Sequence, residues 1–187
     1  MHLIKTSMKG LLIIKPLVFE DERGFFLETY RQNKFKKSGI SPVFVQDNLS
    51  FSVKHTLRGL HFQVKYPQAK LVQALTGEIF DVAVDIRPNS ATYGKWMGIY
   101  LSEHNRRLLF IPEGFAHGFC VLSETAHVVY KCSDYYHPDD EGGVLWSDPT
   151  IGIDWPVEVP IVSEKDKKLP SLSDLSPEKL YCPMRKP

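Results

Sequence analysis

The stretch Glu78–Ile86 is the feature that most limits the fold of this chain. Its apolar residues Phe80, Val82, Val84 and Ile86 alternate with Asp81, Ala83 and Asp85. A period of two belongs to a β-strand, whose successive side chains point to opposite faces of a sheet. The alternation therefore predicts a strand with one face on a hydrophobic core and the other face toward a polar space.

Other segments indicate further strands, because they are rich in Val, Ile and aromatic residues and are bounded by turn residues. These segments are Leu11–Phe19, Phe25–Tyr30, Val43–Val53, Lys70–Leu75, Trp96–Leu101, Leu108–Ile111, Gly118–Leu122 and Ala126–Cys132. Between two of them, Thr76-Gly77 predicts a tight hairpin.

Helical signals are few and short. They are a basic turn at Asn33–Ser38, a capped turn at Ser163–Asp166 and a Pro-initiated turn at Ser176–Leu180. Many short strands with few helices favour an antiparallel sandwich or barrel. A length of 187 residues suits one domain. We expect a single domain over residues 1–187, in which 157–187 form a Pro-rich, charged tail.

Composition disfavours several classes of protein. The 23 Lys and Arg residues against 22 Asp and Glu give a net charge of +1, whereas a nucleic-acid binder normally has a basic excess. No apolar run approaches the roughly 18 residues of a membrane helix, and no signal-peptide pattern is present. Cys120, Cys132 and Cys182 form no CxxC pair and are expected to be buried thiols. We therefore expect a cytoplasmic protein that binds neither membranes nor nucleic acid.

The histidines do not form a metal-binding motif. Metal sites in β-barrels usually contain an HxH or HxxxH pair with a carboxylate nearby, and neither spacing occurs here. Gln63 occupies the place of the second histidine after His61, and His117 ends a separate Pro-x-Gly-x-x-His segment. The sequence therefore predicts no metal.

The same histidines are candidates for acid–base chemistry. On a strand, His61 and Gln63 share a face, so Arg58-Gly-Leu-His61-Phe-Gln63 can form a polar pocket wall. Lys70 lies either on the surface or across the pocket from His61, and Tyr130 is either a core residue or a proton donor. Spacing leaves these alternatives open. It also does not single out one of the acidic candidates, which are Asp81, Asp85, Glu141 and Asp166.

A series of longer motifs resembles one known family. The motifs are Gln46-Asp-Asn-x-Ser50, Leu57-Arg-Gly-Leu-His-Phe-Gln63, Gln68-Ala-Lys-Leu-Val72, Glu78–Arg87, Tyr93-Gly-x-Trp96, Ile111–Phe119, Val129-Tyr-Lys131, Asp134-Tyr-Tyr136, Trp146-Ser-Asp148 and Ile153-Asp-Trp-Pro156. Together they resemble the dTDP-4-dehydrorhamnose 3,5-epimerases, nucleotide-sugar enzymes of the cupin superfamily. The likeness runs from about Lys15 to Pro170.

The resemblance implies an all-β fold, a cupin-type antiparallel jelly-roll barrel with a few short peripheral helices. It also implies a homodimer that uses neither a metal nor an organic cofactor. Within the family pattern, His61 is the catalytic base and Asp166, on a Ser-x-Lys-Asp turn, orients it. Lys70 supports the enolate, and Tyr130 donates a proton from the opposite face.

The resemblance also implies a set of substrate-binding positions. They are Arg23, Glu28, Gln46, Asn48, Arg58, His117, Tyr136 and Glu141. Arg23 and Glu28 frame an N-terminal segment that, in this family, reaches the neighbouring subunit. A diphosphate would suit Arg58, Arg23 and His117, and thymine could stack on Tyr136. A different interpretation makes His117 a structural residue, hydrogen-bonded within the barrel to Asp81.

The expected activity is conversion of dTDP-4-dehydro-6-deoxy-D-glucose to dTDP-4-dehydro-L-rhamnose by inversion at C3 and C5. A C–H next to a ketone needs a base and a charge partner for the enolate, and His61 and Lys70 fit these two tasks. One alternative is a relative with the same residues that inverts a single centre. An alternative from another class is a non-catalytic or metal-dependent cupin.

Overall fold

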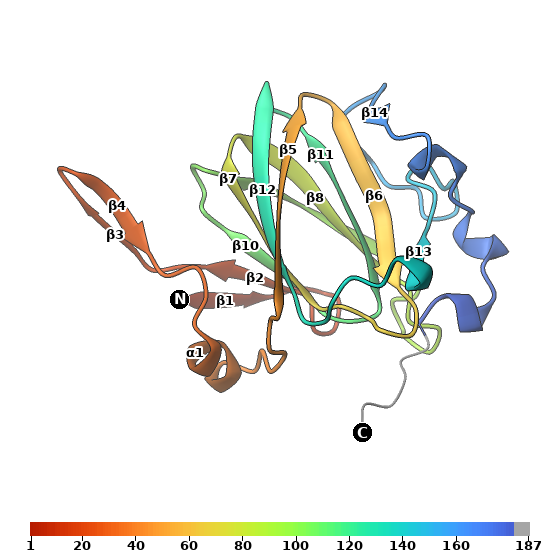
Figure 1. The fold of residues 1–187 in the computed structure, drawn as a ribbon, viewed down its shortest axis with the longest axis horizontal. Coiled ribbons are helices and arrows are strands. Elements are labelled where there is room, and N and C mark those ends of the chain that lie inside the picture. Colours follow the sequence, from red (N-terminus) through yellow and green to blue (C-terminus); the bar gives the residue numbers. More distant parts are fainter. Residues whose placement is uncertain (182–187) are drawn as a thin grey trace.

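The computed structural model describes residues 1–181, which form two sheets facing each other and a separate hairpin (Figure 1). The first sheet has the order β1 (His2–Lys5), β2 (Leu12–Lys15), β10 (Leu108–Ile111), β7 (Lys70–Thr76), β12 (Thr125–Cys132) and β5 (Gln46–Val53). The second has the order β13 (Glu141–Gly143), β6 (Thr56–Gln63), β11 (Phe115–Val121), β8 (Glu78–Asp85) and β9 (Trp96–Ser102), with β14 (Ile161–Val162) parallel to β6. The all-β expectation is confirmed.

The expected hairpin at Thr76-Gly77 is wrong. β7 belongs to the first sheet and β8 to the second, so the chain crosses between sheets at this turn. Gly77 has φ +73°, and a Cβ there would lie 2.2 Å from the carbonyl oxygen of Thr125. Glycine is therefore required by both the backbone angle and the close approach. A hairpin and a corner between sheets give the same local signal.

β8 is buried on both faces, not on one as its alternation suggests. The face with Val84 lies in a hydrophobic cluster with Leu172 of the C-terminal segment. The opposite face was expected to be polar, yet Ala83 belongs to the main core between the sheets. Asp81 and Asp85 meet the expectation, because the buried carboxylate of Asp81 hydrogen-bonds His117 and that of Asp85 pairs with Arg87. The C-terminal segment covers the outer face of β8, so the apolar side chains of that face lie in a second hydrophobic core.

β6 is not among the segments expected to be strands from their apolar content, because Arg58, Gly59 and His61 interrupt that pattern, although the shared face of His61 and Gln63 assumes a strand there. His117 of β11 pairs with His61, and Phe119 pairs with Arg58, so three steps along β6 match two along β11. This extra residue is a β-bulge, which re-aims the side chains that follow it. As a result Arg58 and His61, an odd number of residues apart, both line one cavity.

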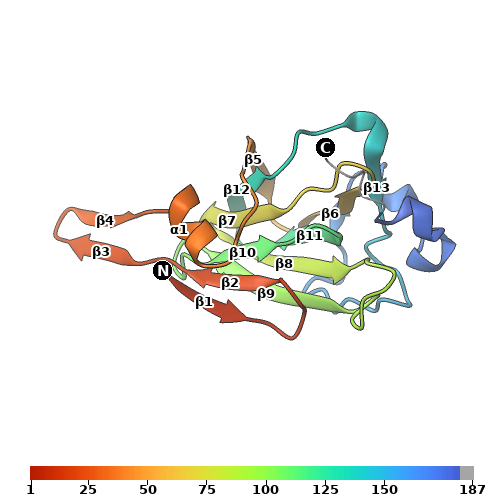
Figure 2. The ribbon, with the colours of Figure 1, turned by 90° about the horizontal axis from the view of Figure 1, so that it is seen from below.

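Helices are short and peripheral, as expected. α1 (Gln32–Lys37) lies outside the two sheets (Figure 2). Its Phe35 packs in a cluster with Ile14 and Phe110. Four 3₁₀ turns follow: η1 (Pro138–Asp140), η2 (Asp166–Lys168), η3 (Leu172–Asp174) and η4 (Pro177–Lys179). The capped turn before η2 is confirmed, because Asp166 N donates to Ser163 Oγ at 3.1 Å. No helix among residues 1–181 is long and apolar enough to cross a membrane.

The hairpin of β3 (Val18–Asp21) and β4 (Gly24–Leu27) extends away from both sheets (Figure 1). Its aromatic residues Phe19, Phe25 and Phe26 are 59%, 56% and 69% exposed. Exposed apolar side chains gathered on one projecting element are unusual on a protein surface. In the described chain, Cys120 and Cys132 are free and buried as expected. Cys182 lies outside the described residues.

Candidate active site

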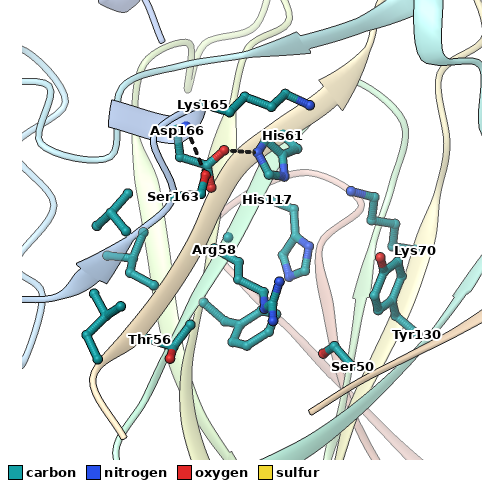
Figure 3. A pocket seen from close by; sticks show the side chains of 15 residues that line it. Ser50, Thr56, Arg58, His61, Lys70, His117, Tyr130, Ser163, Lys165 and Asp166 are labelled. Carbon is teal, nitrogen blue, oxygen red and sulfur yellow. Dashed lines mark hydrogen bonds and ion pairs between the residues drawn. The ribbon is translucent and has the colours of Figure 1, made fainter. Parts of the chain in front are cut away.

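Two adjoining cavities open between the sheets and share His61, Lys70 and Tyr130. The larger, of about 540 Å³, is also lined by Ser50, Thr56, Leu57, Arg58, His117, Gly118, Phe119, Ile161, Val162, Ser163, Lys165 and Asp166 (Figure 3). The smaller, of about 280 Å³, is also lined by Gln46, Asn48, Phe62, Gln63, Gln68, Cys132, Tyr136 and Glu141. The two cavities contain ten of the twelve site residues expected from the sequence.

His61 and Asp166 form a pair on one wall of the larger cavity. His61 Nε2 lies 2.8 Å from Asp166 Oδ1, and Gly59 N donates to Asp166 Oδ2 at 3.2 Å. Burial opposes ionisation of Asp166, but the hydrogen bonds from His61 and Gly59 hold its pKa below the usual range. An ionised carboxylate behind an imidazole fixes the orientation of the ring and favours the imidazolium that forms when it takes a proton.

Replacing Asp166 with asparagine is expected to lower the free energy of unfolding by about 1–3 kcal/mol near neutral pH. The pKa of Asp166 is depressed in the folded protein. The stabilisation is therefore fully present above the unfolded pKa of about 3.9 and is lost as the pH falls through the folded pKa. Urea unfolding of both proteins at about pH 7 and about pH 3 measures the difference. A difference of equal size at both pH values would contradict the pairing.

Lys70 and Tyr130 come from the facing sheet, on the neighbouring strands β7 and β12 (Figure 3). Burial lowers the pKa of Lys70, and within the described chain its ammonium has no ion pair. A buried cation without an ion-pair partner is stabilised by any negative charge that develops beside it. Burial raises the pKa of Tyr130, so its hydroxyl keeps its proton at neutral pH and is able to donate it.

The smaller cavity contains a connected polar group. Tyr136 N donates to Gln46 Oε1 at 2.9 Å, and the Tyr136 hydroxyl donates to Glu141 Oε2 at 2.7 Å. Gln46 in turn donates to Asn48 at 3.1 Å. Lys165 also reaches Glu141 Oε2, at 2.5 Å. Sequence reasoning missed Lys165 as a site residue, although it stands next to Asp166 within the Ser-x-Lys-Asp turn.

Arg58 and His117 also line the larger cavity; Arg58 is exposed, whereas His117 is buried. Arg58 Nε donates to Ser52 Oγ at 3.0 Å. His117 Nε2 lies 2.9 Å from Asp81 Oδ2, so the internal hydrogen bond that the sequence left as an alternative is present. His117 also lines the cavity, and Asp81 is able to fix its ring for a ligand.

Comparison with known proteins agrees with this geometry. The sequence model of the dTDP-4-dehydrorhamnose 3,5-epimerase family matches residues 5–174. The chain belongs to this family. It is 57% identical to the dTDP-4-dehydrorhamnose 3,5-epimerase of Methanothermobacter thermautotrophicus, over 88% of this chain and 90% of that relative. The resemblance inferred from the motifs is confirmed.

Solved structures of relatives superpose closely. The dTDP-6-deoxy-D-glucose-3,5-epimerase of Legionella pneumophila, in complex with dTDP-4-keto-L-rhamnose, gives a TM-score of 0.94 at 48% identity, covering 96% of this chain and 97% of that one. A 3'-monoepimerase of Streptomyces bikiniensis, in complex with dTDP-quinovose, gives 0.84 at 31% identity, covering 90% and 86%. The two-sheet barrel is the expected cupin-like jelly roll.

Two residues that the epimerase family pattern assigns to substrate do not reach either cavity of this chain. The Arg23 guanidinium bonds Asp21 at the tip of the β3–β4 hairpin, where its side chain is 84% exposed. Glu28 pairs with Lys34 at 3.1 Å. Arg23 therefore lies at the tip of the projecting hairpin, and Glu28 lies directly after β4, beside α1. No group of three or more His, Cys, Asp and Glu side chains among residues 1–181 is arranged to hold a metal ion.

Proposed function

We propose that the chain is a dTDP-4-dehydrorhamnose 3,5-epimerase, which inverts C3 and C5 of dTDP-4-dehydro-6-deoxy-D-glucose. The observation that carries the proposal is the opposition of the His61–Asp166 pair and Tyr130 across one cavity, with Lys70 beside Tyr130. Inversion next to a ketone requires a base on one face, an acid on the other and a cation at the oxygen between them. The identities with named 3,5-epimerases support the same activity.

Each inversion then takes two proton transfers. His61 removes the proton from the carbon next to the C4 ketone, and the bonding electrons pass to the C4 oxygen to give an enolate. Lys70 stabilises this oxyanion, while Asp166 stabilises the imidazolium. Tyr130 delivers its proton to the opposite face of the carbon. Solvent then exchanges protons with His61 and Tyr130, and the cycle repeats at the second centre.

Substrate binding divides between the two cavities. We assign the thymine to the ring of Tyr136, which lines the smaller cavity and is held by Glu141 and Gln46. Arg58 and His117 provide cationic and polar contacts in the larger one. His61, Lys70 and Tyr130 belong to both, so the reacting sugar is assigned to the place where the cavities meet.

Replacing Tyr130 with phenylalanine is expected to separate exchange from inversion. His61 and Lys70 remain and still form the enolate, but the opposite face lacks its proton donor. Deuterium should enter the sugar with retained configuration, while inversion falls by about 10²-fold or more. NMR of the sugar in D₂O measures both. Equal loss of exchange and inversion would show that Tyr130 acts in binding or folding instead.

We further propose a cytoplasmic homodimer of one-domain chains, in which residues from 157 form a tail that carries Asp166. The exposed phenylalanines of the β3–β4 hairpin support a contact with a second copy, and Arg23 and Glu28 would then enter the partner's cavity. This accounts for their distance from the site of their own chain.

Mixing two inactive variants tests the shared site. In a mixed dimer of Arg23→Ala and His61→Ala chains, one site receives native His61 from one chain and native Arg23 from the other. Activity is therefore expected to return in part on mixing. Native mass spectrometry confirms that mixed dimers form. Mixed dimers without recovered activity would contradict the arrangement.

A single-centre epimerase is the second candidate, because the monoepimerase structure has the same fold at 31% identity. The proton coupling constants of the product distinguish the two. Inversion at both C3 and C5 supports the proposal, whereas inversion at one centre only assigns the chain to the second candidate.

A further inference from the structure

Gln63 lines the smaller cavity, but both of its amide N–H donors and its carbonyl oxygen already bond the protein's own backbone. It lies two residues after His61 on β6 and is 5% exposed. A glutamine side chain has two N–H donors and one carbonyl oxygen. Both donors are used, toward the backbone oxygens of Tyr66 at 2.6 Å and Tyr135 at 3.1 Å. The oxygen accepts from His137 N at 2.7 Å.

These three bonds join two loops around one residue. Tyr66 belongs to the loop between β6 and β7, and Tyr135 and His137 belong to the loop between β12 and η1. Tyr136 lies between the two residues that Gln63 holds, so the backbone is fixed on both sides of it. The rings of Tyr66 and His137 also stack, with centroids 4.2 Å apart. The loops are thereby fastened to the strand that carries His61.

Tyr136 depends on this support because little else packs against it. Tyr136 is 50% exposed. Its backbone N–H donates to Gln46, and its hydroxyl donates to Glu141. An aromatic ring that binds a base must be held at a fixed place and angle. In enzymes generally, displacement of a positioning group by about 1 Å lowers the reaction rate by up to about 10²-fold. Gln63 supplies that restraint through the main chain.

We infer that Gln63 is a positioning residue for nucleotide recognition: it holds Tyr136 in place for the nucleobase without touching the substrate. The inference rests on the proposed function, because it assigns the base to Tyr136. The inference also explains why a glutamine is present two residues after His61, where an HxH metal-binding pair would have its second histidine. That glutamine orders the binding loops and leaves the chemistry to His61.

Binding of thymidine diphosphate, measured by calorimetry, tests the inference without catalysis. Gln63→Glu keeps the shape and the acceptor but removes both donors, and Gln63→Met keeps the volume without either. We expect both variants to bind about tenfold more weakly and to raise KM to the same extent. Their kcat should stay within about threefold of the native value, because His61 and Tyr130 are untouched.

A double-mutant cycle separates positioning from general damage. In a Tyr136→Ala background, loss of the Gln63 amide should weaken binding no further, because the ring it positions is gone. The control is Thr6→Val in the β1–β2 turn, outside both cavities. It removes a hydroxyl that accepts from Met8 N and whose one proton lies within reach of the Met8 and Leu11 carbonyl oxygens. Thr6→Val should lower the melting temperature about as much as the Gln63 variants do. It should nevertheless keep native binding of thymidine diphosphate and native kcat.

Several results would overturn the inference. Native thymidine diphosphate affinity in folded Gln63 variants would do so, as would additive losses in the cycle or a fall in kcat without a rise in KM. Failure of both Gln63 variants to fold would make Gln63 a residue of stability instead. These outcomes differ from failure of the proposed function, in which the native protein itself neither binds thymidine diphosphate nor epimerises the sugar.

Discussion

Replacing His61 with alanine is expected to lower kcat by about 10³- to 10⁴-fold and to remove deuterium exchange at both sugar carbons. His61 is the base on its wall of the cavity, and its partner Asp166 lies on the side of His61 away from Lys70 and Tyr130 (Figure 3). The other cavity histidine, His117, is tied to Asp81. Glu141, the carboxylate of the smaller cavity, is held by Tyr136 and Lys165. We therefore expect no other described group to take over the proton transfer.

The exchange assay measures this loss directly, with His104→Ala as the control. His104 is an exposed histidine in the turn after β9 and lines neither cavity. The control variant should exchange at the native rate. The melting temperature of His61→Ala should fall by no more than that of Asp166→Asn, because the buried Asp166 loses its imidazole partner but keeps the hydrogen bond from Gly59 N. Near-native exchange in folded His61→Ala would contradict the assignment of the base.

Replacing Lys70 with methionine is expected to lower kcat by about 10²- to 10³-fold, as the loss of an oxyanion donor does elsewhere. The same change should leave stability equal to native or higher. Burial lowers the pKa of Lys70 because its charge is poorly solvated, and methionine fills a similar volume without that cost. A gain in stability with a loss of activity is the mark of a charge kept for catalysis.

Kinetics and urea unfolding of the same protein samples test both parts, with Lys37→Met as the control. Lys37 is an exposed lysine of α1 and should tolerate the change in both measurements. If Lys70→Met keeps full activity, the enolate has another charge partner. If it unfolds more readily than the native protein, Lys70 contributes to the fold and the argument from burial is wrong.

The strands were largely predictable because alternation and turn residues are local signals. β8, β10 and β12 begin and end within a residue or so of their expected positions. The sheet to which a strand belongs is not local information. The turn at Gly77 looks like a hairpin but joins two sheets, and β6 is hidden because the cavity requires Arg58 and His61 where a core strand would be apolar.

Prediction of the site residues depended more on the family motifs than on the spacing of individual residues. Asp166 is 105 residues from His61, so no local sequence pattern connects the two. Their pairing was predicted from the resemblance to the family. Lys165 was overlooked because a single lysine on a charged tail looks like a surface residue. Arg23 and Glu28 are the reverse case, since the motif assigns them to substrate while one chain alone holds them far from both cavities.

Deuterium uptake by the sugar tests the central claim most directly. The native protein is incubated with dTDP-4-dehydro-6-deoxy-D-glucose in deuterated water, and the mass of the sugar nucleotide is then measured by mass spectrometry. A gain of two deuterons is predicted, one each at C3 and C5, with no added metal or organic cofactor. A gain of one would restrict the reaction to a single centre. No gain from folded protein would contradict proton abstraction by His61 and the function built on it.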